Sequence, residues 1–210
     1  MSSLKELTEL VIAGDIQGVK EVTRQLLDSG VDPLQVINEG LIPGIEEVGV
    51  RFKEGEMFVP EMMIAAQAMK AGVELAKERI SGADVPTVGK VVIGSVKGDL
   101  HDIGKNLVIM MLESSGFSVV DLGVDVPVEK FVQAIREHRP QIVGMSALLT
   151  TTMPVMRDVI RALEKEGLRQ EVKVIIGGAP VTQAYADEIG ADGYAADAAA
   201  AIDLCKGLLS

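Results

Sequence analysis

The chain has 210 residues and carries 20 lysines and arginines against 31 aspartates and glutamates, a formal net charge of −11. At about 150 residues per domain, this length allows one large domain or two small ones, each with a real core. The acidic balance argues against nucleic-acid partners and anionic membranes, because few cations could neutralise phosphates. No apolar run approaches the roughly 18 residues of a membrane span, and the first residues, MSSLKELTEL, lack the apolar core of a signal peptide. The single cysteine, Cys205, excludes a disulfide framework and a cysteine-based zinc site. We therefore expect a soluble, cytoplasmic protein.

The first eighty or so residues have the apolar periodicity of helices. Four stretches show it: 4–13, 15–29, 32–48 and 60–76. Asp15 and Asp32 are candidate helix caps, and Pro33 would occupy a first helical position. Pro43 predicts a kink in the third helix. Four amphipathic helices with short connections predict an all-α four-helix bundle over residues 1–83.

The pattern changes after the small, polar segment SGADVPT at 81–87, which we take as a linker. Beyond it, short apolar runs alternate with helical patterns. The runs lie at 90–95, 118–122, 142–146, 174–178 and 192–195, and the helical patterns near 105–115, 128–138, 153–166, 182–189 and 197–209. This alternation predicts an α/β domain over residues 88–210, a doubly wound, flavodoxin-like, five-stranded parallel sheet. Ligands of such sheets bind beyond the carboxyl ends of the strands, at the topological switch point.

The first predicted strand runs into SVKGDLHDIGKN, which is neither a dinucleotide-binding fingerprint nor a P-loop. Asp99 and His101 are two residues apart, so both side chains can project from one face of an extended loop. A carboxylate that accepts a hydrogen bond from one imidazole nitrogen makes the other nitrogen a better metal ligand. The alternative is a histidine that only hydrogen-bonds within its loop. A conventional metal site needs three or four protein ligands, whereas one histidine suffices if a macrocycle fills the other positions.

Two further strand ends add small and hydroxyl-bearing residues. Hydroxyls follow the third strand between Ser146 and Thr152, and Gly177-Gly178 ends the fourth. Each has an ordinary explanation as a helix cap or a turn. Together they predict a long groove for a bulky ligand. Flavin mononucleotide fits poorly, since these loops lack the aromatic residues that sandwich its ring.

These motifs resemble a known family. GDLHDIGKN is similar to the D-x-H-x-x-G signature of cobalamin-binding domains, Ser146-Ala147-Leu148 to their S-x-L element, and Gly177-Gly178 to their G-G element. The helical half, with EGEMFVPEMM, resembles the four-helix cap of cobalamin-dependent methionine synthase. The whole chain resembles the corrinoid proteins of three-component methyltransferase systems, of the methylamine, quaternary amine and methanol type.

The resemblance implies that His101 ligates cobalt from below, in place of the cofactor's own base. Asp99 would hydrogen-bond His101, and the hydroxyl of Thr152 would complete the relay where methionine synthase has a serine. Ser146 and Thr150 would contact the buried tail of the cofactor. The full set of implied cofactor-binding residues in the α/β half is Gly98, Asp99, Leu100, His101, Asp102, Ile103, Gly104, Ser146, Leu148, Thr150, Thr152, Gly177, Gly178, Tyr194 and Ala198.

In the helical half, the resemblance implies that Phe52, Val59 and Met62 shield the upper cobalt face. Val59 and Met62 also fit the interior of the bundle. A hinge in residues 81–87 would let the cap move aside for each partner.

The implied function is that of a methyl carrier whose cobalamin alternates between methylcobalamin and cob(I)alamin. A substrate-specific methyltransferase would load it, and a second methyltransferase, acting on tetrahydrofolate or a thiol, would unload it. A reductive activating protein is the third implied partner, and no catalytic side chain is expected beyond the cofactor. The alternatives are the cobalamin-binding subunit of an adenosylcobalamin mutase, which lacks this type of cap, and a cobalamin-based sensor, which needs an output module. A receiver-like or flavodoxin-like signalling module would not explain the histidine motif.

Overall fold

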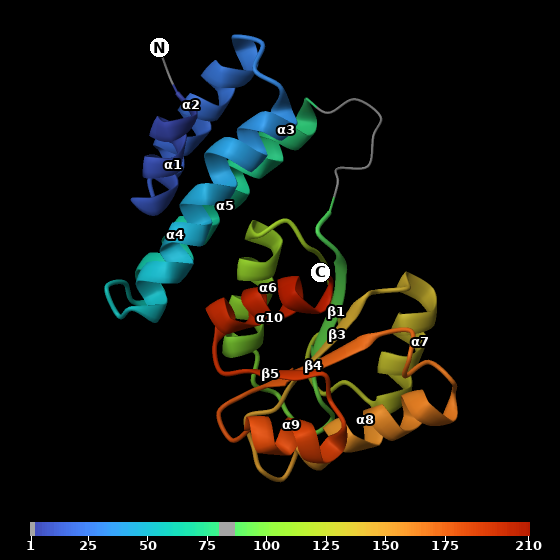
Figure 1. Cartoon of the computed structure of the whole chain (residues 1–210). Helices are drawn as coiled ribbons and strands as arrows, with labels where there is room; N and C mark the ends of the chain where they lie inside the picture. The colour runs from blue at the N-terminus through green and yellow to red at the C-terminus, as the bar shows by residue number, and fades with distance from the viewer. Residues whose placement is uncertain (1–2, 80–86) are drawn as a thin grey trace. The chain divides into compact units, whose positions relative to one another are not determined.

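The computed structural model describes residues 3–79 and 87–210 (Figure 1). The described residues divide into two compact units, a helical one before the gap and an α/β one that holds nearly all of the residues after it. The predicted linker at 81–87 lies outside the described residues except for Thr87. In the described parts of the chain, no helix is long and apolar enough to cross a membrane.

The helical unit contains the four predicted helices, the third of which is divided. Its elements are α1 (Leu4–Ile12), α2 (Ile16–Asp28), α3 (Pro33–Gln35), the π-helix η1 (Val36–Leu41), α4 (Ile42–Lys53) and α5 (Val59–Glu78). Helix α2 packs against α5, and α1 packs against α4 and η1. Its core holds the apolar side chains that recur at helical spacing, among them Leu7, Val11, Val19, Leu41, Ile45, Val48, Met62 and Met69.

The predicted caps are present. The side chain of Asp15 accepts a hydrogen bond from the Gly18 N–H, and that of Asp32 caps α3 with Pro33 at its start. The irregularity predicted at Pro43 is a π-helical turn just before it, where the N–H of Ile42 donates five residues back to Ile37. Proline has no N–H with which to continue the α-helical ladder, so the register changes at this point.

The α/β unit is a five-stranded parallel sheet in the order β2-β1-β3-β4-β5. Its strands are β1 (Lys90–Ser95), β2 (Ser118–Asp121), β3 (Ile142–Ser146), β4 (Lys173–Gly177) and β5 (Gly193–Ala195), and its helices are α6 (Ile103–Ser114), α7 (Val128–His138), α8 (Pro154–Lys165), α9 (Gln183–Ile189) and α10 (Ala198–Leu208). All five predicted strands are confirmed. Helices α6 and α10 cover one face of the sheet and α7, α8 and α9 the other (Figure 1).

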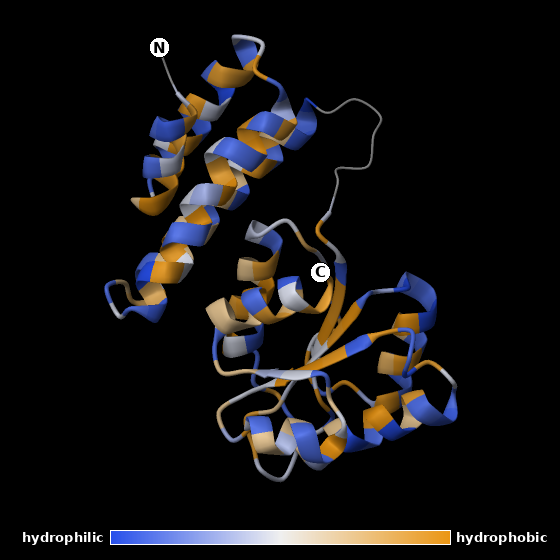
Figure 2. Ribbon diagram, viewed as in Figure 1, coloured by the Kyte–Doolittle hydropathy of each residue, from blue (hydrophilic) through white to orange (hydrophobic). Residues whose placement is uncertain are grey.

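The central strands β1, β3 and β4 are mostly apolar, with lysines only at the starts of β1 and β4, as a sheet covered on both faces requires (Figure 2). Beneath α7 and α8, Phe131, Met156 and Leu163 pack on a core that includes Val92 and Val174. Strands β1 and β3 are neighbours, yet the helices that follow them leave to opposite faces. The carboxyl edge between β1 and β3 is therefore the topological switch point, where sheets of this kind bind ligands.

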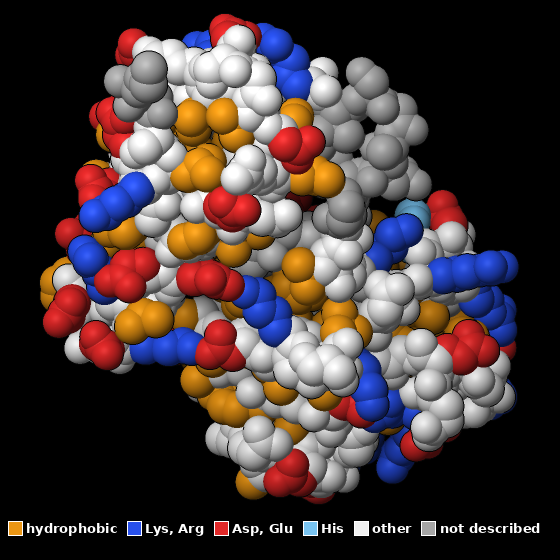
Figure 3. All heavy atoms as spheres, turned by 45° about the horizontal axis from the view of Figure 1, so that its top comes forward, with side chains coloured by type: hydrophobic (Ala, Val, Ile, Leu, Met, Phe, Trp, Pro, Cys, Tyr) orange, Lys and Arg blue, Asp and Glu red, His pale blue; other side chains and the backbone are white. Residues whose placement is uncertain are grey.

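Although the net charge is −11, the acidic side chains do not form a single patch on the face that Figure 3 displays. Acidic, basic and apolar side chains are interspersed there.

Candidate cofactor-binding site

The loop after β1 begins with a tight turn. The N–H of Asp99 donates to the carbonyl of Val96 over 3.0 Å, and Gly98, the third residue of this turn, has φ +84°. A positive φ at this position is the requirement of a type II turn, which glycine meets without strain. The turn reverses the chain at the carboxyl edge of the sheet and directs Asp99 inwards.

Asp99 is fully buried and joins two loops through hydrogen bonds. Its Oδ1 accepts from Nδ1 of His101 at 2.7 Å and from the His101 N–H at 3.1 Å. Its Oδ2 accepts from the Leu148 N–H at 2.7 Å, the Leu149 N–H at 3.3 Å and Oγ1 of Thr152 at 2.8 Å. One carboxylate thus ties the loop after β1 to the loop after β3.

These bonds decide the charge of Asp99. Burial by itself raises the pKa of this carboxyl. The hydrogen bonds from the Leu148 N–H, from the ring and N–H of His101 and from the Thr152 hydroxyl outweigh burial and hold the pKa of Asp99 below its usual range. Asp99 is therefore an ionised acceptor at neutral pH.

His101 is held by its ring and by its backbone. Nδ1 faces the ionised Asp99, so Nδ1 carries the proton, an assignment that follows from the hydrogen-bond network. The buried hydroxyl of Ser95 donates to the His101 carbonyl over 2.7 Å. The ring is half-exposed, and Nε2 makes no hydrogen bond to any residue that the structure describes. Nε2 therefore offers a lone pair in a fixed direction, as second-shell carboxylates arrange for metal-binding histidines.

Large apolar side chains stand exposed on the same two loops. Leu100 is 72% exposed and Ile103 is 86% exposed, and Leu148 and Leu149 are also exposed. A Cβ added to Gly104, in the first turn of α6, would meet nothing within 4 Å, so protein packing does not explain this helical glycine. Exposed apolar side chains and an unobstructed glycine on the loops beside His101 fit a bulky macrocycle that brings its own metal ligands.

A conventional metal centre has no support in residues 3–79 and 87–210. No group of three or more His, Cys, Asp or Glu side chains within them could hold a metal ion. A single histidine ligand is sufficient only where a macrocycle supplies the other coordination positions, so the donor set fits cobalamin.

The remaining strand ends have mixed roles. Ser146 is the last residue of β3, and Thr150 is exposed on the loop beyond it. A Cβ at Gly177 would lie 3.0 Å from the Ala195 carbonyl oxygen. At Gly178, which has φ +126°, a Cβ would lie 1.9 Å from the Ala147 carbonyl oxygen. The approach of the protein's own backbone is therefore enough to require glycine at 178.

Two implied residues lie further along the sheet. Tyr194 is in β5, which β4 separates from β3. Ala198 is buried as the first residue of α10. The structure shows no hydrogen bond from the described part of the chain that links Tyr194 or Ala198 to the His101 loop.

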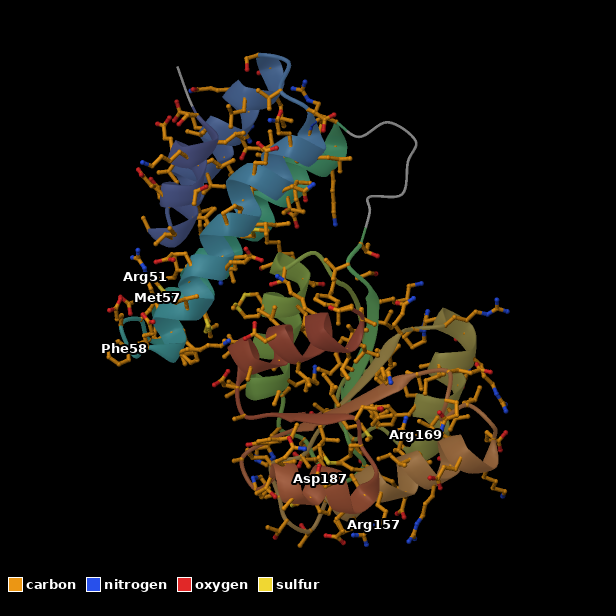
Figure 4. All side chains as sticks on the ribbon, in the orientation of Figure 1. Arg51, Met57, Phe58, Arg157, Arg169 and Asp187 are labelled. Atoms are coloured by element: carbon orange, nitrogen blue, oxygen red, sulfur yellow. The ribbon has the colours of Figure 1, made fainter. Side chains whose placement is uncertain are left out.

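The three cap residues differ from one another. Met62 is fully buried in the helical unit, whereas Val59, the first residue of α5, is 40% exposed. Phe52 is half-buried near the end of α4. The interior position considered for Val59 is thus wrong, because the residue lies at the exposed start of its helix. The neighbouring Phe58 is 69% exposed, in the turn labelled in Figure 4.

Sequence reasoning missed three residues that support the loop after β1: Ser95, Lys105 and Asp125. The signal for Ser95 was a lone hydroxyl at the end of an apolar strand. Lys105 is almost fully buried, an uncommon place for an ammonium group. Asp125 has φ +52°, and no feature of the sequence other than the preceding Gly123 indicated a turn there.

Known proteins match both units. Residues 3–77 and residues 89–203 each match a family model described as a B12 binding domain. The dimethylamine corrinoid protein 1 of Methanosarcina acetivorans is 51% identical over 181 residues, which cover 86% of this chain and 85% of the relative.

Solved structures match the whole chain. A cobalamin-binding protein from Desulfitobacterium hafniense DCB-2 is 35% identical, with a TM-score of 0.83 and coverage of 99% of both chains. A chain of the methanol:cobalamin methyltransferase complex MtaBC from Methanosarcina barkeri is 33% identical, with a TM-score of 0.88 over 98% of this chain and 79% of that one. With two B12-binding domains and a relative that matches along most of its length, the chain belongs to the family of cobalamin-binding corrinoid proteins of methyltransferase systems.

Proposed function

We propose that this protein is a methyl carrier that holds cobalamin with His101 as the lower cobalt ligand and with the cofactor's own base displaced. The observation that carries the proposal is the His101 ring, whose Nδ1 lies 2.7 Å from Oδ1 of Asp99 and whose Nε2 makes no hydrogen bond to a residue in the described ranges, on a loop with exposed apolar side chains. Cobalamin, when bound, supplies a cobalt centre that accepts and releases a methyl group.

The chain's own residues bind and orient the cofactor. Asp99 would set the tautomer of His101 and raise the basicity of Nε2, and Thr152 would hold the second oxygen of this carboxylate. Leu100 and Ile103 would exclude water from the lower side of the macrocycle. No side chain needs to act as acid, base or nucleophile, because the cofactor carries the bond-making step.

Polar groups further from His101 would take the cofactor's tail. Ser146 and Thr150 follow β3 at the same edge of the sheet, and the glycines at 177 and 178 leave the neighbouring strand end free of side chains. Tyr194 would close the far end of this groove. These assignments follow the order of the family's motifs along the chain.

The helical unit would act as the cap. Val59 and Phe52 are the residues available to shield the upper face of the cofactor, since both retain exposed surface. Met62 would contribute from the interior by holding α5 in place. The hinge expected in residues 81–87 would release the cap when a partner docks.

Three partners complete the proposed cycle: a substrate-specific methyltransferase, a second methyltransferase that uses tetrahydrofolate or a thiol, and a reductive activating protein. The methanol:cobalamin methyltransferase complex supports the first of these. The dimethylamine corrinoid relative supports a methylamine as the methyl donor.

Reconstitution with hydroxocobalamin tests the ligand assignment. We expect equimolar cobalt in the wild type and in His101→Ala, with a visible spectrum that changes in the variant. His138→Ala is the matched control, because the ring of His138 lies at the end of α7 with Nε2 4.0 Å from Oε1 of its neighbour Glu137, and the bond from Lys90 goes to the backbone carbonyl, which the substitution keeps. Failure to retain a corrinoid, or identical spectra for wild type and His101→Ala, would overturn the proposal.

A transfer assay tests the carrier role. The loaded protein is first reduced to the Co(I) state with a low-potential chemical reductant, and is then incubated with a dimethylamine or a methanol methyltransferase and isotopically labelled donor. The label is followed to tetrahydrofolate or to a thiol through a second methyltransferase. Label on cobalt and then on an acceptor supports a carrier. Binding of adenosylcobalamin with no methyl uptake would instead favour a mutase subunit or a sensor.

A further inference from the structure

We propose that residues 121–125, which run from the last residue of β2 into the loop after it, are a positioning clamp for the loop that carries His101, acting through Asp121 at one end of that loop and Asp125 at the other. This inference rests on the proposed function, since it takes His101 as the cobalt ligand. Neither aspartate belongs to the family motifs quoted above.

Asp125 holds the start of the loop. Its Oδ1 accepts a hydrogen bond from the Gly98 N–H at 2.7 Å, and its own N–H donates to the Asp99 carbonyl over 2.9 Å. Beside it, Val96 and Val126 form an isolated parallel bridge that extends the pairing of β1 with the β2 side. The turn that directs Asp99 inwards is therefore bonded on its outer side to Asp125.

The backbone of Asp125 adopts an uncommon conformation that packing against the core does not explain. Its φ of +52° is in the left-handed region, which residues with a side chain adopt rarely and asparagine and aspartate more often than most. Asp125 is exposed, so core packing does not hold it there. Its hydrogen bonds run to Gly98 and Asp99, in the loop of the site. An uncommon conformation maintained by contacts of this kind points to a positioning role.

Asp121 holds the end of the loop through a buried cation. Its Oδ1 accepts from Nζ of Lys105 at 2.8 Å, and Lys105 is almost fully buried. Nζ of Lys105 also donates to Oδ1 of Asn106 over 2.7 Å, and Nδ2 of Asn106 donates to Oδ2 of Asp102 over 3.1 Å. A buried ammonium group must keep its acceptors, so this chain of bonds fixes the first turn of α6 against the end of β2.

The two clamped points bracket the ligand. Gly98 precedes His101 by three residues and Lys105 follows it by four, and both are bonded to residues of the same short segment. A metal ligand has to be held within about 0.5 Å of its productive position, and loops achieve this only when their supports are rigid. Residues 121–125 supply that support from outside the D-x-H-x-x-G motif.

The test uses three substitutions of Asp125. Asp125→Ala removes the acceptor and leaves the strain, Asp125→Gly removes both, and Asp125→Asn keeps an acceptor and tolerates the left-handed conformation. In the cofactor-free protein, we expect amide hydrogen exchange at Gly98 and His101 to accelerate by at least about tenfold in the Ala and Gly variants and to remain near wild type in the Asn variant.

The cobalamin-loaded protein gives the second readout. In the cob(II)alamin form of protein labelled with 15N-histidine, the electron paramagnetic resonance spectrum shows two-line splitting wherever His101 is coordinated, whereas the cofactor's own 14N base would give three lines. We expect the Gly and Ala variants to lose part of that signal and to bind cobalamin about tenfold more weakly, the lower end of the effect of second-shell residues. Asp125→Asn should rescue both properties.

Lys105→Met tests the other end of the clamp, with Lys97→Met as control because Lys97 is an exposed lysine of the same loop. We expect Lys105→Met to reduce the nitrogen splitting and Lys97→Met to leave it unchanged. Loss of splitting in Lys97→Met to the same extent would contradict the specificity of the clamp.

The outcomes separate the two proposals. A wild-type protein without the two-line splitting defeats the proposed ligation by His101, whatever the variants do. If the wild type has the splitting and Asp125→Gly matches it in exchange, splitting and affinity, the clamp is wrong and the proposed function stands. Because Asp125→Gly relieves strain, it should fold even if Asp125→Ala does not.

Discussion

The loop after β1 and the helices α4 and α5 both carry residues that the sequence marked for the cofactor, and these residues differ in how the structure uses them. In the loop, Nδ1 of His101 lies 2.7 Å from Oδ1 of Asp99, and the hydroxyl of Thr152, which follows another strand, donates to Oδ2 of Asp99. In the helical unit, Met62 is buried while Val59 stays at the surface. Polar residues at a strand end are informative because they have few structural uses, whereas apolar residues at helical spacing serve a core equally well.

The largest effect should come from Asp99. Asp99→Ala removes the acceptor of the His101 ring, of the Thr152 hydroxyl and of three backbone N–H groups, and we expect the α/β unit to lose about 4 kcal/mol of unfolding free energy. The chain has no tryptophan, and both tyrosines, Tyr185 and Tyr194, lie in the α/β unit, so tyrosine fluorescence during urea unfolding reports this unit.

The control is Asp158→Ala, an exposed aspartate of α8, which should shift the same transition by less than about 0.5 kcal/mol. Equal shifts for the two variants would show that Asp99 does not join the two loops.

The cap residues give the next largest effect and test the contrast directly. Met62→Ala should lower the unfolding free energy of the helical unit by about 3 kcal/mol, because it opens a cavity in the core. Val59→Ala should cost less than about 0.5 kcal/mol, since the side chain is already exposed. Far-UV circular dichroism reports the helices of both units and tyrosine fluorescence only the α/β unit, so the shift at Met62→Ala should appear in circular dichroism without a matching shift in fluorescence. A cost at Val59 as large as that at Met62 would place both residues in the core.

A smaller effect is expected at the link between the two strand ends. Thr152→Val keeps the shape of the side chain but removes the hydrogen bond to the ionised Asp99, so the α/β unit should lose about 1.5 kcal/mol in the tyrosine fluorescence assay. Thr152→Ser retains the hydroxyl and should recover most of this loss. A serine variant as unstable as the valine variant would mean that packing, and not the hydrogen bond, makes Thr152 important.

The smallest structural effect, but a clear pH dependence, is expected at Cys205. Burial raises the pKa of its thiol to about 12. Because the thiolate is the reactive form, alkylation by iodoacetamide at pH 8 should be on the order of 10³-fold slower than in urea. The rate should keep rising about tenfold per pH unit between pH 8 and 10, as for a group titrating well above this range. A plateau near pH 9 would show that the thiol is accessible in the native α10.

Much of the fold could be read from local patterns. Short runs of four to six residues predicted all five strands, and the caps at Asp15 and Asp32 began α2 and α3 where predicted. Pro43 predicted a kink in the third helix, but the pattern did not predict the π-helical form of the turn before it. The spacing of Asp99 and His101 allowed both side chains to project from one face of their loop, and the family resemblance implied the hydrogen bond between them that the structure shows.

The sequence by itself determined which side chains could reach each other through a few bonds of backbone: the strands, the caps, and a histidine beside its carboxylate. Only the tertiary structure decided the contacts between segments distant in the chain. It brought the Thr152 hydroxyl to Asp99, the Asp125 carboxylate to the Gly98 N–H, and the Asp121 carboxylate to the buried Lys105. It also decided that Met62 is buried in the core while Val59 is exposed. The reason is physical: local geometry follows from the chain's own dihedral angles, whereas contacts across the sheet depend on the order in which parallel strands pair.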